Sequence, residues 1–155
     1  MPIRCPTLIV HHQAGKEYWA EQEIGDILFP HDPGVIIERT DYRGVLLVYT
    51  SIPPNKAYRL ITREVLTSID RVIPVEGCFK VGSASNLEEA IETVFSVVKR
   101  YECVRASVSL RGWLKKYSRI LSREITENLH VEKSCRTILY VESIDSYLLY
   151  GLVSG

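Results

Sequence analysis

The stretch from Val104 to Arg123 combines basic and aromatic residues in a pattern that favours binding of nucleic acid. It contains six Lys or Arg residues and no Asp or Glu, whereas residues 1–103 contain 11 basic and 14 acidic residues. Basic side chains neutralise phosphates, and aromatic and guanidinium planes stack on unpaired RNA bases. The residues that we expect to contact RNA are Arg105, Arg111, Gly112, Trp113, Lys115, Lys116, Tyr117, Arg119 and Arg123.

The sequence around these residues predicts a strand, a glycine turn and a helix in succession. Residues 104–110 alternate between apolar and polar types, as in a strand with one buried face. Gly112 follows, and residues 118–129 have apolar residues at helical spacing. Because the first turn of a helix exposes backbone N–H groups, its start would add an anion site beside the basic side chains. The alternative is a solvated basic face with Trp113 in the core.

No part of the sequence predicts a catalytic or metal site. His11 and His12 end an apolar run, and Glu17, Glu21 and Glu23 follow them. Adjacent residues of a strand point to opposite faces, so at most one of the two histidines can face a given site. Phosphate-binding glycine loops and the serine-nucleophile motif are absent from the sequence. We therefore expect no catalytic residue, no metal ligand and no cofactor, and a protein that is not an enzyme.

The cysteines and the apolar runs bear on the compartment. Cys5, Cys78, Cys103 and Cys135 are far apart and lack the spacing of zinc-binding motifs. Free buried thiols in a reducing compartment are the favoured interpretation, and a disulfide, as in intracellular proteins of hyperthermophiles, is the alternative. No run reaches the roughly 18–20 apolar residues of a membrane span, and the N-terminal run is too short for a signal peptide. These features predict a cytoplasmic protein without a membrane partner.

Residues 1–82 are expected to form a ferredoxin-like domain with the order β-α-β-β-α-β. Apolar and β-branched runs predict its strands, and apolar residues at helical spacing predict its helices. The second helix is expected to bury Val65 together with Ala57, Leu60 and Ile61. The expected elements are strands at residues 8–12, 35–39, 45–49 and 72–81, and helices at residues 16–29 and from Pro53-Pro54 onward.

Residues 83–155 are expected to form a second domain with the order α-β-α-β-β, so the chain belongs to the α+β or α/β class. Residues 82–85, Gly-Ser-Ala-Ser, form the predicted linker. Asn86 is the expected N-cap of a helix whose apolar stripe continues to Tyr101. After the strand and helix described above, two further strands are expected at residues 137–142 and 147–153.

The second domain resembles the THUMP domain, an RNA-binding module of tRNA-modifying proteins. The matching features are the strand that ends in Arg111-Gly112, the serine-started helix after it, and the strand Ile138-Leu-Tyr-Val-Glu142. The first domain resembles the ferredoxin-like unit that precedes THUMP in many such proteins, through Gly44-Val-Leu-Leu-Val, residues 57–60 and Arg71-Val-Ile-Pro74. One departure is Cys135-Arg136, where the family often has Pro-Asp. It adds Arg136 to the expected RNA contacts.

The resemblance implies that the protein binds tRNA at its acceptor end. Stand-alone versions of the module resemble an adaptor that presents tRNA to a cytidine acetyltransferase. The expected function is therefore non-catalytic tRNA binding, with a tRNA-modifying enzyme such as that acetyltransferase as the partner. A ferredoxin-like regulatory or assembly domain that binds a small molecule or a protein is the alternative function.

Overall fold

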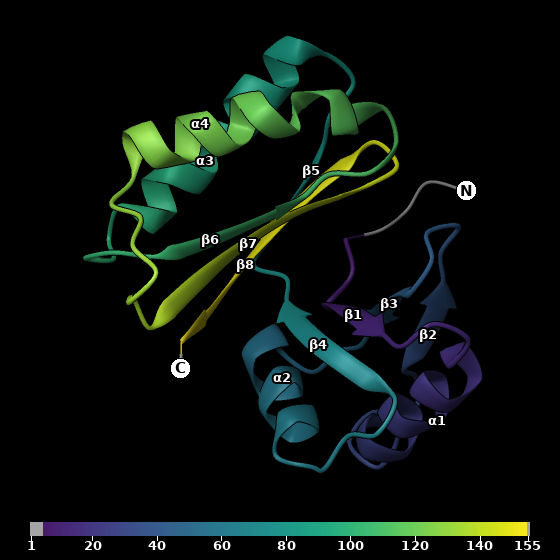
Figure 1. The fold of residues 1–155 in the computed structure, drawn as a ribbon. Helices are drawn as coiled ribbons and strands as arrows, with labels where there is room; N and C mark the ends of the chain where they lie inside the picture. The colour runs from purple at the N-terminus through teal and green to yellow at the C-terminus, as the bar shows by residue number, and fades with distance from the viewer. Residues whose placement is uncertain (1–4, 155) are drawn as a thin grey trace. The chain divides into compact units, whose positions relative to one another are not determined.

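A four-stranded antiparallel sheet with two helices on one face forms the first unit of the chain (Figure 1). The computed structural model describes residues 5–154. The strand order is β2-β3-β1-β4, which is the order of a ferredoxin-like fold. The elements of this unit are β1 (Leu8–His12), α1 (Glu17–Leu28), β2 (Ile36–Arg39), β3 (Val45–Tyr49), α2 (Pro54–Thr62) and β4 (Ile69–Pro74).

The helical spacing of the sequence explains how α1 and α2 pack. Ala20, Ile24 and Leu28 follow one another at every fourth position, and all three are fully buried. From α2, Ala57 and Ile61 enter the same core, where they meet Leu8, Val10, Leu46 and Val48 of the sheet. The ferredoxin-like prediction for this half of the chain is confirmed.

The second unit has the strand order β5-β8-β7-β6, with α3 and α4 over one face of its sheet (Figure 1). Strand β6 runs parallel to β7, because the chain returns through two helical elements before β7 begins. The elements are β5 (Gly77–Lys80), α3 (Ala84–Val98), β6 (Arg105–Ser109), the 3₁₀ helix η1 (Gly112–Tyr117), α4 (Ser118–Asn128), β7 (Thr137–Ile144) and β8 (Tyr147–Ser154). Across residues 5–154, no helix is both long and apolar enough to cross a membrane.

The strand predicted at residues 72–81 is two strands, one in each sheet. The N–H of Val75 donates to the carbonyl of Thr7 in the first sheet, and the N–H of Glu76 donates to Tyr150 in the second. The chain therefore changes sheet between Val75 and Glu76, where the two units divide. The sequence placed the division at residues 82–83, which instead lie between β5 and α3 of the second unit.

Three predicted helix boundaries also differ in the structure. Helix α2 ends at Thr62, so Val65 lies beyond it and is 92% exposed rather than buried. Helix α3 starts earlier than predicted: Ser83 is the N-cap, and its Oγ accepts a hydrogen bond from the N–H of Asn86. Tyr101 lies past the end of α3 and is exposed. In each case a local capping or turn interaction decides the boundary, which apolar spacing does not encode.

A disulfide joins Cys103 to Cys135, with a Cα–Cα distance of 5.9 Å. For this pair, the alternative of a disulfide holds and the favoured interpretation of free thiols is wrong. The bond connects the segment before β6 to the segment before β7 across a separation of 32 residues. A loop of this length corresponds to roughly 3–4 kcal/mol of stabilisation in the chain-entropy model.

The carboxylate of Glu23 on α1 ties the helix to the segment before β4. It accepts hydrogen bonds from the N–H groups of Thr67 and Ser68, at 2.9 and 2.7 Å. Partial burial acts to raise the pKa of Glu23, but these hydrogen bonds outweigh burial and lower the pKa below its usual value. A carboxyl group whose pKa is lower in the folded state stabilises the fold above its unfolded-state pKa.

We predict that Glu23→Gln lowers the melting temperature at pH 7 and makes stability less dependent on pH. In the wild type, the contribution of Glu23 is lost as the pH falls below the ordinary range of a glutamate and through the lowered pKa of the folded state, because the carboxylate becomes protonated. The variant lacks this loss, so the two melting curves should converge at low pH. Asp26→Asn, an exposed position on the same helix, is the control. An unchanged difference between wild type and Glu23→Gln across this pH range would contradict the prediction.

Candidate nucleic-acid interface

Gly112 forms the turn that links β6 to the basic segment. Its φ is 67°, in the left-handed region that glycine adopts without strain. Arg111 precedes it in an extended conformation, and η1 starts at Gly112 itself. Glycine at position 112 is therefore a requirement of the turn geometry, and Gly112 shapes the interface through its backbone.

Arg111 is held inside the second unit. Its Nη1 lies 3.0 Å from Oε1 of Glu142, whose side chain is 2% exposed, and the Arg111 side chain is itself 18% exposed. Ser143 completes the clamp, because its Oγ accepts from the N–H of Arg111 at 2.6 Å and donates to the carbonyl of Arg111 at 2.9 Å. The sequence placed Arg111 among the phosphate contacts. The structure instead gives it a partner within the protein, so its charge is largely balanced.

The 3₁₀ helix η1 displays two aromatic rings and a lysine together. Leu114 is fully buried and anchors η1, whereas Trp113 is 37% exposed, so Trp113 is not a core residue. The rings of Trp113 and Tyr117 meet edge to face, with centroids 6.0 Å apart. The Nζ of Lys116 lies 5.7 Å from the Trp113 ring centroid and 5.3 Å from that of Tyr117. These contacts hold the lysine and both rings in a preferred arrangement.

Helix α4 continues the basic surface. Leu121 and Ile125 point into the core, and this orientation leaves Arg119 and Arg123 exposed to solvent. The helix continues directly from η1, and the N–H of Ser118 donates to the carbonyl of Lys115. The anion site predicted at Ser118 is therefore not a free helix start. We call the following set the η1–α4 surface: the exposed residues Trp113, Lys115, Lys116, Arg119 and Arg123, together with the half-buried Tyr117.

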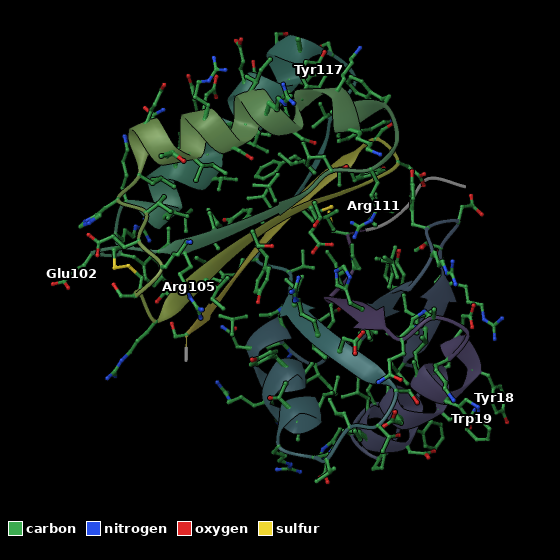
Figure 2. The ribbon with its side chains drawn as sticks, in the orientation of Figure 1. Tyr18, Trp19, Glu102, Arg105, Arg111 and Tyr117 are labelled. Atoms are coloured by element: carbon green, nitrogen blue, oxygen red, sulfur yellow. A yellow bond between two sulfur atoms is a disulfide. The ribbon has the colours of Figure 1, made fainter. Side chains whose placement is uncertain are left out.

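Arg105 and Arg136, two of the predicted RNA contacts, lie away from the η1–α4 surface. Arg105 and Arg111 are at opposite ends of β6 (Figure 2). Arg136 is exposed just before β7, and β6 and β7 are parallel, so Arg105 and Arg136 share the end of the sheet where both strands begin. The predicted set is thus divided into the η1–α4 surface, a separate pair of arginines, and Arg111 and Gly112, which serve the fold of the second unit.

The structure does not bring the histidines and glutamates of the N-terminal region together as a metal site. His12 is buried, and its Nδ1 lies 2.8 Å from the carbonyl of Gln13. Within residues 5–154, the potential ligand atoms that converge belong to Cys103, Glu132 and Cys135. Sequence spacing missed this group, because its members come together through the parallel pairing of β6 and β7.

No protein-family model matches the sequence, and no curated protein matches it. Solved structures do share its fold. TrmN from Thermus thermophilus is 14% identical, with a TM-score of 0.64 over 94% of this chain and 44% of its own. PH1313 from Pyrococcus horikoshii Ot3 is 14% identical, with a TM-score of 0.62 over 97% of this chain and 56% of its own. A 4-thiouridine synthetase in complex with RNA and bound ATP is 12% identical, with a TM-score of 0.53 over 97% of this chain and 41% of its own.

The chain has the predicted THUMP-like fold. It spans about half the length of the solved structures that it matches. The prediction that the protein is not an enzyme is contradicted, because the proteins that share this fold include a synthetase by name. The absence of a catalytic motif within 155 residues does not exclude catalysis for a fold that forms one part of longer enzyme chains.

We predict that Glu142→Ala lowers the free energy of unfolding by about 3 kcal/mol, because it leaves the largely buried Arg111 without its anion. Chemical denaturation followed by circular dichroism measures the change. Glu127→Ala, which removes an exposed glutamate of α4, should stay within about 0.5 kcal/mol of the wild type. Equal stability of Glu142→Ala and Glu127→Ala would show that the clamp contributes nothing.

Proposed function

We propose that the protein binds tRNA through the η1–α4 surface and holds it for chemical modification of one nucleotide. The observation that carries the proposal is the exposure of four basic side chains on η1 and α4, one of them against two aromatic rings, on a stretch of twenty residues without an acid. Phosphates would meet the four charges, and an unpaired base would stack on Trp113 or Tyr117.

The charge distribution supports RNA as the ligand although the net charge of the protein is zero. Lys115, Lys116, Arg119 and Arg123 belong to two consecutive helical elements, so their positive potentials add over one surface. A likeness in fold to a 4-thiouridine synthetase that was crystallised with RNA supports the same assignment. Arg105 and Arg136 would extend the footprint along the sheet, and a cytoplasmic location, as the sequence predicts, would give access to tRNA.

The acceptor end of tRNA is the part that we propose is bound, as the THUMP resemblance implies. The catalytic centre that modifies the bound tRNA can be supplied in one of two ways. In one, a cytidine acetyltransferase receives the bound tRNA from this protein. In the other, a thiolation or methylation centre is part of the same polypeptide. Nucleoside analysis of tRNA from cells without the gene separates them: loss of acetylated cytidine supports the first, and loss of a thiolated or methylated nucleoside supports the second.

We predict that the variant Lys115→Ala/Lys116→Ala/Arg119→Ala loses most tRNA affinity at about 0.15 M salt. The slope of log K against log salt concentration should fall by about 2–3, because each phosphate contact contributes roughly 0.7–0.9. Fluorescence anisotropy with labelled tRNA over a range of salt concentrations measures both quantities. Arg111 is left intact, since its substitution would also disturb the clamp with Glu142.

The matched control is Lys56→Ala/Arg59→Ala/Arg63→Ala, which removes three exposed charges from the first unit, two on α2 and one on the residue that follows it. It changes the net charge by the same amount, so a general electrostatic effect would weaken both variants alike. Equal loss in the two variants would contradict a site on η1 and α4. If the wild type binds tRNA no better than an unrelated neutral protein does, the RNA assignment falls and the regulatory alternative takes its place.

A further inference from the structure

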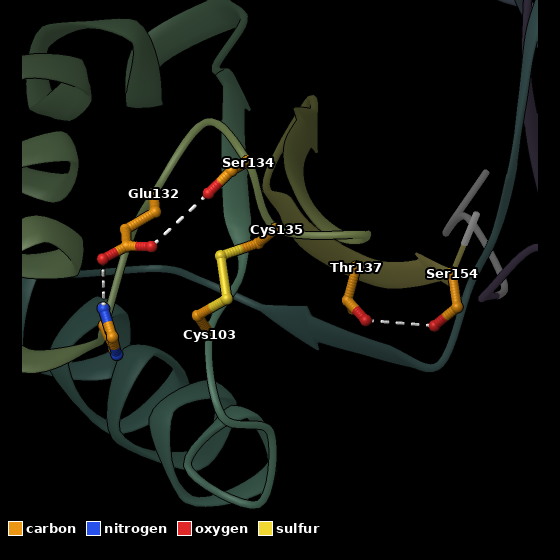
Figure 3. Close-up of a disulfide and its surroundings, with 7 residues drawn as sticks. Cys103, Glu132, Ser134, Cys135, Thr137 and Ser154 are labelled. Atoms are coloured by element: carbon orange, nitrogen blue, oxygen red, sulfur yellow. Dashed lines mark hydrogen bonds and ion pairs between the residues drawn. A yellow bond between two sulfur atoms is a disulfide. The ribbon is translucent and has the colours of Figure 1, made fainter.

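Three side chains with metal-binding atoms converge where β6 and β7 begin. The sulfur atoms of Cys103 and Cys135 and a carboxylate oxygen of Glu132 all lie within 4.8 Å of one another. Figure 3 shows the two cysteines joined as a disulfide, with Glu132 on the loop beside them. None of these residues belongs to the η1–α4 surface, so the proposed RNA binding does not account for the group.

The backbone holds this group together independently of the S–S bond. The N–H of Val104, next to Cys103, donates to the carbonyl of His130 at 3.0 Å. The N–H of Glu132 donates to the carbonyl of Val104 at 3.1 Å, and the N–H of Cys135 donates to the carbonyl of Glu132 at 3.2 Å. Breaking the disulfide therefore leaves these hydrogen bonds in place, and the three side chains remain neighbours.

The carboxylate of Glu132 is itself oriented by its neighbours. Nε2 of His130 lies 2.8 Å from its Oε1, and the Oγ of Ser134 lies 3.5 Å from its Oε2 (Figure 3). Residues that hold a ligating side chain in this way are a regular feature of metal sites in proteins. The arrangement leaves the outer side of the Glu132 carboxylate open, because Glu132 is 54% exposed.

We propose that the reduced protein binds Zn²⁺ through the thiolates of Cys103 and Cys135 and the carboxylate of Glu132, with water as the fourth ligand. Tetrahedral zinc takes this mixture of sulfur and oxygen ligands, whereas thiolates disfavour Mg²⁺ and Ca²⁺. Zn–S bonds of about 2.3 Å place two sulfurs roughly 3.8 Å apart. The Cα–Cα distance of 5.9 Å allows that separation through side-chain rotation.

Replacement of the disulfide by zinc takes two steps, reduction and metal binding. A dithiol reductant gives two electrons and two protons to the Cys103–Cys135 bond and becomes a disulfide itself. Two free thiols result. Zn²⁺ then displaces one proton from each thiol as the two Zn–S bonds form. In a reducing compartment the zinc form replaces the disulfide as the link between the segments that precede β6 and β7.

The test is a titration of the full chain with Zn²⁺, and in parallel with Co²⁺, after reduction with a phosphine that does not compete for the metal. We expect one equivalent to bind to the reduced wild type and the cobalt form to show thiolate charge-transfer absorption. The oxidised protein should lack this site. The variant Cys103→Ser/Cys135→Ser should lack the zinc site as well. It retains Cys5 and Cys78, so any metal binding by these two cysteines is measured in the variant and subtracted from the wild-type signal.

Glu132→Gln should weaken zinc binding at least about tenfold, and His130→Gln by about tenfold, because a ligand and its orienting partner are removed. Glu127→Gln on α4 should bind zinc as the wild type does. Glu132 is exposed, so its variant keeps the fold, which circular dichroism verifies. Equal zinc affinity of wild type, Glu132→Gln and the double serine variant would overturn the proposal. Loss of the folded state on reduction, even with Zn²⁺ present, would overturn it as well.

Discussion

The pairing of Arg111 with the buried carboxylate of Glu142 is the constraint on which the arrangement of the second unit depends. Glu142 is buried near the C-terminal end of the long strand β7, where an unpaired charge would carry a large desolvation cost. Arg111 supplies the opposite charge, and Ser143 fixes its backbone through two hydrogen bonds. The end of β6 is thereby set, and the positive φ of Gly112 turns the chain into η1 at a defined place.

Because Arg111 pairs with Glu142 inside the protein, the basic side chains that can bind phosphate are those of the helical residues that follow it. Leu114 and Leu121 anchor η1 and α4 to the core, so the basic side chains between and beyond them face solvent. Lys116 lies against two aromatic rings, which limits its freedom before any ligand arrives. A protein of zero net charge can present a strongly basic surface in this way, since its acids are concentrated elsewhere, four of them on α1 alone.

Apolar spacing was sufficient to predict most helices and strands, because the faces of α1, α3 and α4 and the strands of both sheets follow the periods of 3.6 and 2 residues. It failed where long-range partners decide. Residues 72–81 were predicted as one strand, but their backbone groups pair with two different sheets. For Trp113 the sequence left two positions open, an RNA contact or the core, and the burial of Leu114 next to it leaves Trp113 exposed. The partnership of Arg111 with Glu142 and that of Cys103 with Cys135 join residues about thirty positions apart, which local patterns do not connect.

Ultraviolet cross-linking of the protein to tRNA, followed by mass spectrometry of the linked peptides, tests the central claim most directly. The chain offers an internal comparison, because Tyr18 and Trp19 on the acidic helix α1 are more exposed than Trp113 (Figure 2). If the η1–α4 surface binds RNA, cross-links will concentrate at Trp113 and Tyr117 and will disappear at high salt, while Tyr18 and Trp19 remain unlinked. Cross-links at Tyr18 and Trp19 with none at Trp113 or Tyr117 would contradict the account.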